Sequence, residues 1–316
     1  MQSGFPLDLL PYLRCPMDSG RLEAADASMS FAVAGRVRCQ ACGTIYLIAD
    51  GILSLLLTDH LHPESAREMA LRDGKNAAIL GGARSEWSSH IADDLEVGPT
   101  LDAVGPTAGL VVLELGCGAG RYTLALARHA AAVVAVDFSR AGLLLLRGKL
   151  AADACVALVQ ADVTKPHAAP RRFDRVLSTL HSNLPDAGHR IASIAHVAQS
   201  LNRGGRAVIS MHHFSGRDRL AGVNASGRYP DSGIFRYYMT RAEAVRESAP
   251  FFARVRFAHI SASIPGLRSV TAARLAARLP LVRSALSRLF LAVCEQPRID
   301  ESADQSSSAL GRAKAS

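Results

Sequence analysis

One stretch constrains the fold more than any other: an apolar run that ends in three closely spaced glycines. Residues 110–120 read Leu-Val-Val-Leu-Glu-Leu-Gly-Cys-Gly-Ala-Gly. The apolar run predicts a buried strand, and Gly116, Gly118 and Gly120 predict a sharp turn with room for a ligand. The spacing fits neither the dinucleotide fingerprint G-x-G-x-x-G nor the P-loop. Glu114 adds an anion, which suits a ligand that carries positive charge better than it suits a phosphate.

The next hundred residues repeat the pattern of an apolar strand followed by polar residues. The run 132–136 ends in Asp137, where a carboxylate can accept two hydrogen bonds from a ribose diol. A third strand includes Asp162 near its end. This alternation of strands and helices predicts a doubly wound α/β sheet. The strands that follow the first are expected at 132–136, 157–163, 173–178 and 206–211, with later strands at 251–260 and 289–295.

Taken together, these motifs resemble the class I S-adenosylmethionine (SAM) methyltransferases. The resemblance implies an α/β fold with a Rossmann-like, seven-stranded sheet and SAM as cofactor. It implies that Glu114 and the backbone of Gly116 and Gly118 hold the methionine end, and that Asp137 holds the ribose. The implied cofactor-binding residues are Glu114, Gly116, Gly118, Gly120, Tyr122, Asp137, Phe138, Asp162 and Val163, with Asp162, Phe138 and Val163 around the adenine.

Candidate acceptor-side residues follow the fourth and fifth strands, where ligands bind in open α/β sheets. Histidine is the side chain best suited to act as a base near neutral pH. We therefore expect His212, His213 and His181 to be the candidate catalytic residues, with His212 or His213 as first choice. Each of them can equally be an ordinary hydrogen-bonding residue. The candidate substrate-binding residues are Asn183, Arg236, Tyr237 and Tyr238.

Residues 1–57 read as a separate small α+β unit. Cys15-Pro-Met-Asp18 and Cys39-Gln-Ala-Cys42 form two knuckles at the spacing of a zinc ribbon. The segment resembles the small zinc-ribbon activators of tRNA and protein methyltransferases, in which the first knuckle is Cys-Pro-x-Cys. Here Asp18 replaces the second cysteine. Either Cys15, Asp18, Cys39 and Cys42 still hold zinc, because zinc accepts a carboxylate oxygen, or the ribbon has lost its metal.

Four segments are therefore expected along the chain. A zinc-ribbon-like domain at 1–57 is followed by helices at 58–106 that form either a lid over the cofactor or a plain linker. The methyltransferase domain covers 107–296, and 297–316 are expected to be disordered. The sequence of residues 270–287 predicts a basic amphipathic helix. This helix is expected either to pack on the sheet or to touch a membrane surface. No apolar run reaches the length of a membrane span, which predicts a cytoplasmic protein.

The distribution of charge along the chain leaves the type of methyl acceptor undecided. The net charge is +8, and residues 201–316 hold 18 basic against 8 acidic residues. That excess suits an RNA acceptor, or it reflects an arginine-rich surface, since only four of the 36 basic residues are lysine. Three functions are open: a methyltransferase acting on an oxygen or nitrogen of a small molecule, a tRNA methyltransferase of the wobble-uridine type with a fused activator, and a non-catalytic scaffold. The small-molecule enzyme is preferred.

Overall fold

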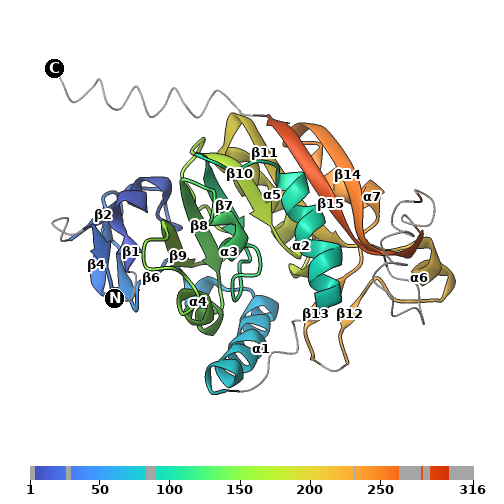
Figure 1. Ribbon diagram of the computed structural model, residues 1–316, viewed down its shortest axis with the longest axis horizontal. Helices are drawn as coiled ribbons and strands as arrows, with labels where there is room; N and C mark the ends of the chain where they lie inside the picture. Colours follow the sequence, from blue (N-terminus) through green and yellow to red (C-terminus); the bar gives the residue numbers. More distant parts are fainter. Residues whose placement is uncertain are drawn as a thin grey trace.

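The computed structural model describes residues 4–25, 30–82, 90–230, 232–262, 279 and 285–298. Their centre is one mixed sheet of eleven strands in the order β14-β15-β11-β10-β7-β8-β9-β6-β5-β4-β2 (Figure 1). Two-stranded sheets, β1-β3 and β12-β13, lie outside it. The fold is thus Rossmann-like, but its sheet is longer than the expected seven strands.

Five parallel strands form the middle of the sheet and all end at the same edge. They are rich in valine, leucine and alanine, and most of their residues are buried, as in strands covered on both faces. β15 runs antiparallel to both of its neighbours, β11 and β14. These strands are β7 (Val111–Leu115), β8 (Ala132–Asp137), β9 (Val156–Gln160), β10 (Phe173–Ser178), β11 (Leu201–His212), β14 (Phe252–Ala262) and β15 (Ser287–Pro297).

The N-terminal strands extend this same sheet. β6 hydrogen-bonds to β9 in parallel, with Leu53 opposite Val159. β5, β4 and β2 then continue as an antiparallel meander. Residues 1–57 therefore pack against the rest of the chain through a shared sheet. The strands of this unit are β1 (Phe5–Pro6), β2 (Leu22–Ala24), β3 (Phe31–Ala32), β4 (Gly35–Cys39), β5 (Ile45–Ala49) and β6 (Ile52–Ser54).

Helices cover both faces of the sheet (Figure 1). Alternate side chains of each strand enter two separate cores: Val112 and Val133 face one, and Leu113 and Val134 face the other. The first core includes side chains of α2 (His90–Val104), α3 (Thr123–Leu126) and α4 (Arg140–Arg147). The second includes side chains of η1 (Leu7–Tyr12), α5 (Ala187–Ser200) and α7 (Arg241–Ser248).

Further elements surround the central strands. α1 (Pro63–Leu80) continues through Gly74 without a break, because Gly74 is exposed and nothing crowds the helix there. The segment after β11 contains α6 (Gly216–Leu220) and a hairpin of β12 (Ser226–Arg228) and β13 (Phe235–Tyr237). α7 begins with a capping box between Thr240 and Glu243.

Other expectations fall outside the described residues. The basic helix expected at 270–287 and the tail expected at 297–316 lie almost wholly there. The remaining helices are the short η2 (Thr58–His60) and η3 (His181–Asn183). Across the described ranges, no helix combines the length and the apolar character that crossing a bilayer requires.

Candidate functional site

The glycine turn after β7 has the backbone that the sequence predicts. Gly116, Gly118 and Gly120 have φ of 78°, 52° and 89°, values that side-chain-bearing residues rarely adopt. A Cβ on Gly120 would lie 2.3 Å from Leu146, so this glycine lets α4 pack closely. A Cβ on Gly118 would meet no atom within 4 Å. Space for a ligand therefore opens at Gly118.

Glu114 lies near the end of β7, directly beneath this turn, and is completely buried. Its Oε2 accepts a hydrogen bond of 2.7 Å from the Thr123 hydroxyl, while Oε1 has no partner among the described residues. Burial raises the pKa of Glu114 to about 7. A buried carboxylate oxygen without a donor fits a ligand that brings its own cation, such as the ammonium group of SAM.

Asp137 ends β8 and holds the turn from the other side. Its two oxygens accept hydrogen bonds of 2.8 Å from the backbone N–H groups of Gly118 and Ser139. Burial raises the pKa of Asp137, and the two N–H donors oppose that rise. A carboxylate can accept more than two hydrogen bonds, so Asp137 can still receive the two hydroxyls of a ribose.

The other expected cofactor residues surround the same edge. Asp162 follows β9, and its Oδ1 accepts hydrogen bonds from the backbone and hydroxyl of Thr164. Phe138 and Val163 are half-buried. Tyr122 is buried in the core with Leu126 and Leu143. α3 begins only after Tyr122 and is a single turn.

The acceptor-side residues form a compact cluster around His212 at the end of β11. Nδ1 of His212 lies 3.2 Å from the Ser182 hydroxyl, and Nε2 lies 3.1 Å from the Tyr229 hydroxyl. The ring of Tyr238 contacts His212 edge-on, at 6.0 Å between centroids. The Arg236 guanidinium lies over Tyr238, 4.4 Å from the ring centroid. We call these five side chains the His212 cluster.

Burial, aided by three nearby arginines, lowers the pKa of His212 to about 4. The imidazole is therefore neutral at pH 7, the form that can accept a proton. Both ring nitrogens are engaged by hydroxyls that can rotate to donate or accept. A proton from an acceptor can therefore reach the imidazole only through one of these hydroxyls, or after that hydroxyl moves aside.

The remaining candidates make no hydrogen bond to His212 among the described residues. His213 points away from the His212 cluster: its Nδ1 contacts the Ser287 hydroxyl at 2.9 Å, and its ring packs on His259. His181 is buried, and neither ring nitrogen has a partner among the described residues. Tyr237 donates to Glu243 at 2.7 Å. Of the expected acceptor-side residues, His213 and Tyr237 thus bond to partners outside the His212 cluster.

Asn183 is half-buried, and its Oδ1 is buried without a partner in the part of the chain that the structure describes. It lies in η3, one residue after Ser182, which belongs to the His212 cluster. An unpartnered amide oxygen at this place can accept a hydrogen bond from a ligand. Asn183 therefore remains a candidate for substrate binding.

Helix α1 connects the cofactor side to the acceptor side. Asp73 Oδ1 accepts hydrogen bonds from the Ser139 hydroxyl at 2.7 Å and from the Ala141 N–H at 3.0 Å. At the other end, Glu64 pairs with Arg228, and Glu68 accepts from the Phe235 N–H at 3.1 Å. In Figure 1, α1 lies between α4 and the β12–β13 hairpin. It lies within residues 58–106, for which the sequence predicts either a lid or a plain linker.

Sequence reasoning missed three members of this site: Tyr229, Ser182 and Asp73. Tyr229 lies in a polar, glycine-rich stretch that resembles a loop, and Asp73 is followed by Gly74, a residue type that disfavours helix. Ser182 had a readable signal, because it follows the fourth strand together with two residues that were singled out.

A second candidate site lies in the N-terminal unit. The ligand atoms of Cys15, Asp18, Cys39 and Cys42 all lie within 4.8 Å of one another. The sulfurs of Cys15 and Cys42 are 3.7 Å apart, and Cys39 Sγ lies 3.3 Å from Asp18 Oδ1. Two thiolates at about 2.3 Å from a tetrahedral zinc lie roughly 3.8 Å apart. The four groups fit a zinc ion.

Comparison with known proteins identifies the middle of the chain. Residues 112–205 match the family model of the methyltransferase domain. A 110-residue stretch is 37% identical to a demethylmenaquinone methyltransferase of Clavibacter sepedonicus. That match covers 35% of this chain and 44% of the relative, so the chain spans less than half of the relative's length. The chain therefore contains a methyltransferase domain.

Solved structures show the same fold at low sequence identity. The complex of the Haloferax volcanii Trm112 methyltransferase activator and a methyltransferase matches with a TM-score of 0.52 and 15% identity, covering 74% of this chain and 98% of that chain. A geranyl diphosphate methyltransferase bound to GPP and sinefungin matches with a TM-score of 0.51 and 15% identity. It covers 75% of this chain and 100% of that chain.

Proposed function

We propose that this chain, which carries a SAM-dependent methyltransferase domain, transfers the methyl group to a small-molecule acceptor held at the His212 cluster. The proposal rests mainly on the position of that cluster. It lies at the ends of β10 and β11, at the same edge of the sheet as Glu114 and Asp137. Two buried carboxyls thus stand on the cofactor side, and a neutral histidine stands on the acceptor side.

In this proposal the residues bind, orient and move a proton. Glu114 and Asp137 hold the ammonium and ribose of SAM, whose sulfonium supplies an already activated methyl group. His212 accepts the proton of the acceptor, and the Ser182 and Tyr229 hydroxyls fix its ring. Since methyl transfer needs in-line contact above all, the cluster contributes mainly by positioning.

A small acceptor suits the closed surroundings of the cluster. α1 is joined to the β12–β13 hairpin by the Glu64–Arg228 pair and the Glu68–Phe235 hydrogen bond. Through these contacts, α1 bridges the cofactor side and the acceptor side. A site bridged in this way favours a compact acceptor over a folded RNA. The names of the similar proteins, demethylmenaquinone and geranyl diphosphate methyltransferases, agree with this preference.

The test has two stages. Calorimetry with S-adenosylhomocysteine (SAH), the demethylated product, should show binding to the whole chain. A screen with radiolabelled SAM should then show methylation of small phenols, alcohols or amines and no methylation of tRNA. Binding of NAD in place of SAH, or methylation of tRNA alone, would contradict the proposal.

We further propose that Cys15, Asp18, Cys39 and Cys42 hold a structural zinc ion. Four protein ligands leave no open position for a substrate, as in other structural sites. Tyr46 supports this geometry, because its hydroxyl lies 3.0 Å from Cys15 Sγ. The metal would fix the two knuckles next to η1 and β5, far from the methyl-transfer chemistry.

A further inference from the structure

The cations around His212 are not all neutralised. Arg72 pairs with Glu68 at 2.8 Å, and Arg228 pairs with Glu64. Arg236 and Arg288 form no ion pair with any carboxylate of the described residues. The side-chain hydrogen bond of Arg236 reaches the Asn224 carbonyl at 3.4 Å, which is long for such a bond. The half-buried Arg236 and the exposed Arg288 therefore carry positive charges that no carboxylate of the described residues pairs.

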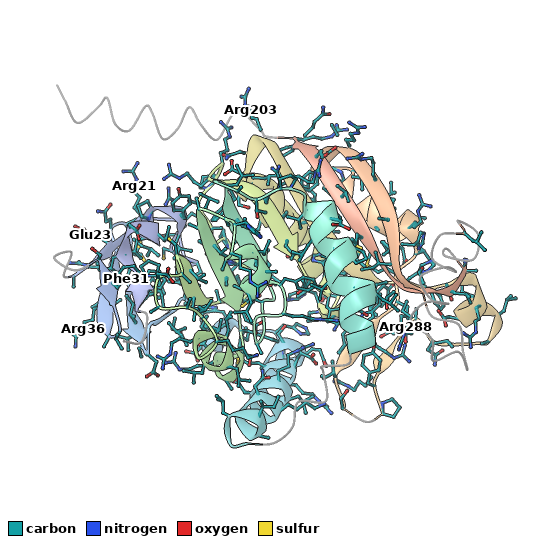
Figure 2. All side chains as sticks on the ribbon, viewed as in Figure 1. Arg21, Glu23, Phe31, Arg36, Arg203 and Arg288 are labelled. Carbon is teal, nitrogen blue, oxygen red and sulfur yellow. The ribbon has the colours of Figure 1, made fainter. Side chains whose placement is uncertain are left out.

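Their positions place both charges next to the His212 cluster. The Arg236 guanidinium lies between two tyrosines, 4.4 Å from the ring centroid of Tyr238 and 5.7 Å from that of Tyr229. Stacking of this kind holds the guanidinium plane and leaves its edge N–H groups free to bind a planar anion. Arg288 lies on β15 (Figure 2) and is exposed. Its charge acts on both His212 and Tyr229.

The same surroundings offer an apolar surface. Phe214 stacks on Tyr238 with an interplanar angle of 10° and a centroid separation of 6.4 Å. Flat rings next to fixed cations suit a ligand that has both an unsaturated body and a negative charge. A neutral acceptor would leave the half-buried Arg236 guanidinium without a counter-ion.

We infer that the methyl acceptor carries an anionic group, a carboxylate or a phosphate, that binds Arg236 and Arg288. This inference rests on the proposed function, because it assigns the His212 cluster to the acceptor. It adds the class of substrate: a small organic anion whose charge lies on the arginine side and whose nucleophile lies toward His212. Arg236 and Arg288 then decide specificity and take no part in proton transfer.

Binding of simple anions tests the inference directly. Calorimetry with the SAH-loaded, full-length protein uses benzoate as the carboxylate probe and inorganic pyrophosphate as the phosphate probe. One of the two should bind, and Arg236→Gln or Arg288→Gln should each weaken that binding about 10- to 100-fold, the loss expected for a charge-assisted hydrogen bond. Arg236→Lys should retain part of it. Binding of neither probe, or unchanged binding in both glutamine variants, would overturn the inference.

The matched control is Arg36→Gln. Arg36 is exposed and lies at the opposite end of the molecule from Arg288 (Figure 2). This variant should bind the probe as the unchanged protein does, and melting temperatures of all variants exclude misfolding as the cause. If probe binding were weakened equally in Arg36→Gln, the net charge of the protein, and not a specific site, would attract the anion.

Paired acceptors extend the test to turnover. Phenolic acids are compared with their methyl esters, and phosphorylated alcohols with the free alcohols. The anionic member of a pair should be methylated with the lower KM, and Arg236→Gln should remove that preference with little change in kcat. Equal methylation of the anionic and the neutral acceptor of a pair, or methylation of RNA alone, would contradict the inference. SAH binding separates the two failures: without it the proposed function itself fails, whereas with it only the acceptor class is wrong.

Discussion

The hydroxyl of Tyr229 lies 3.1 Å from Nε2 of His212 and thereby ties the β12–β13 hairpin to the end of β11. Tyr229→Phe removes this hydrogen bond and keeps the ring. If the hydroxyl orients the imidazole, turnover should fall by roughly tenfold, the effect of about 1.4 kcal/mol. SAH affinity, measured by calorimetry, should be unchanged. A fall in both quantities would point to a general loss of structure.

The two adjacent histidines form a matched pair. His212→Ala should lower turnover by roughly 10²–10⁴, the usual range for a lost general base, and leave SAH affinity intact. His213→Ala removes contacts to Ser287 and His259 and should lower the melting temperature with little change in turnover per folded protein. The reverse result would assign the base to His213.

Glu114→Gln should separate stability from cofactor binding. Burial raises the pKa of Glu114 from 4.5 to about 7, so its contribution to stability is present below pH 4.5 and is lost as the pH rises through 7. Without SAM, the variant should therefore be more stable than the unchanged protein at pH 8, by up to about 3 kcal/mol. Melting temperatures at pH 5 and pH 8 measure the difference.

The same variant should bind SAH more weakly, because a neutral glutamine side chain offers no charge to the ammonium group. In the unchanged protein, SAH affinity should rise between pH 6 and pH 8 as Glu114 ionises, and this rise should be absent in Glu114→Gln. A pH-independent affinity in both proteins would mean that Glu114 does not face the ligand.

Asp137→Asn should weaken SAH binding by roughly 2–4 kcal/mol, at about 1–2 kcal/mol for each of two buried hydrogen bonds. The change also disturbs the turn, because Asp137 accepts from the Gly118 and Ser139 N–H groups. Asp153→Asn, at an exposed aspartate, is the control. Unaltered calorimetric affinity in Asp137→Asn would show that the ribose binds elsewhere.

Metal analysis tests the N-terminal site. The purified protein should contain about one zinc per chain, and Cys39→Ser should release it. Asp18→Cys should keep the metal, since four thiolates are a common zinc site. Cys117→Ser, in the glycine turn, should not change the zinc content. A metal-free protein whose melting temperature is insensitive to chelators would contradict the assignment.

Local sequence predicted the parts of the fold that depend on local patterns. The apolar runs gave the positions of β7, β8, β10 and β11, and Glu114 and Asp137 lie near strand ends as expected. The hairpin was missed because its strands are short and polar, and distant contacts from Glu64 and Glu68 hold it in place. No local pattern records such contacts.

The separation of His212 and His213 was within reach of the sequence. Successive residues of a strand point to opposite faces, so two adjacent histidines at the end of β11 cannot both face one pocket easily. The partner of His212, in contrast, was beyond prediction. Tyr229 reaches it only because the chain returns through a hairpin after α6.

The parallel pairing of β6 with β9 has a consequence for any attempt to shorten this protein. If residues 1–57 were removed, β9 would become an unprotected edge strand, with the N–H and C=O groups that now bond to Ile52, Leu53 and Ser54 open to other chains. Val156–Gln160 is a run of mostly apolar residues without proline, the kind of segment that recruits further strands. The truncated chain should therefore aggregate, even though it would retain every residue of the methyl-transfer site.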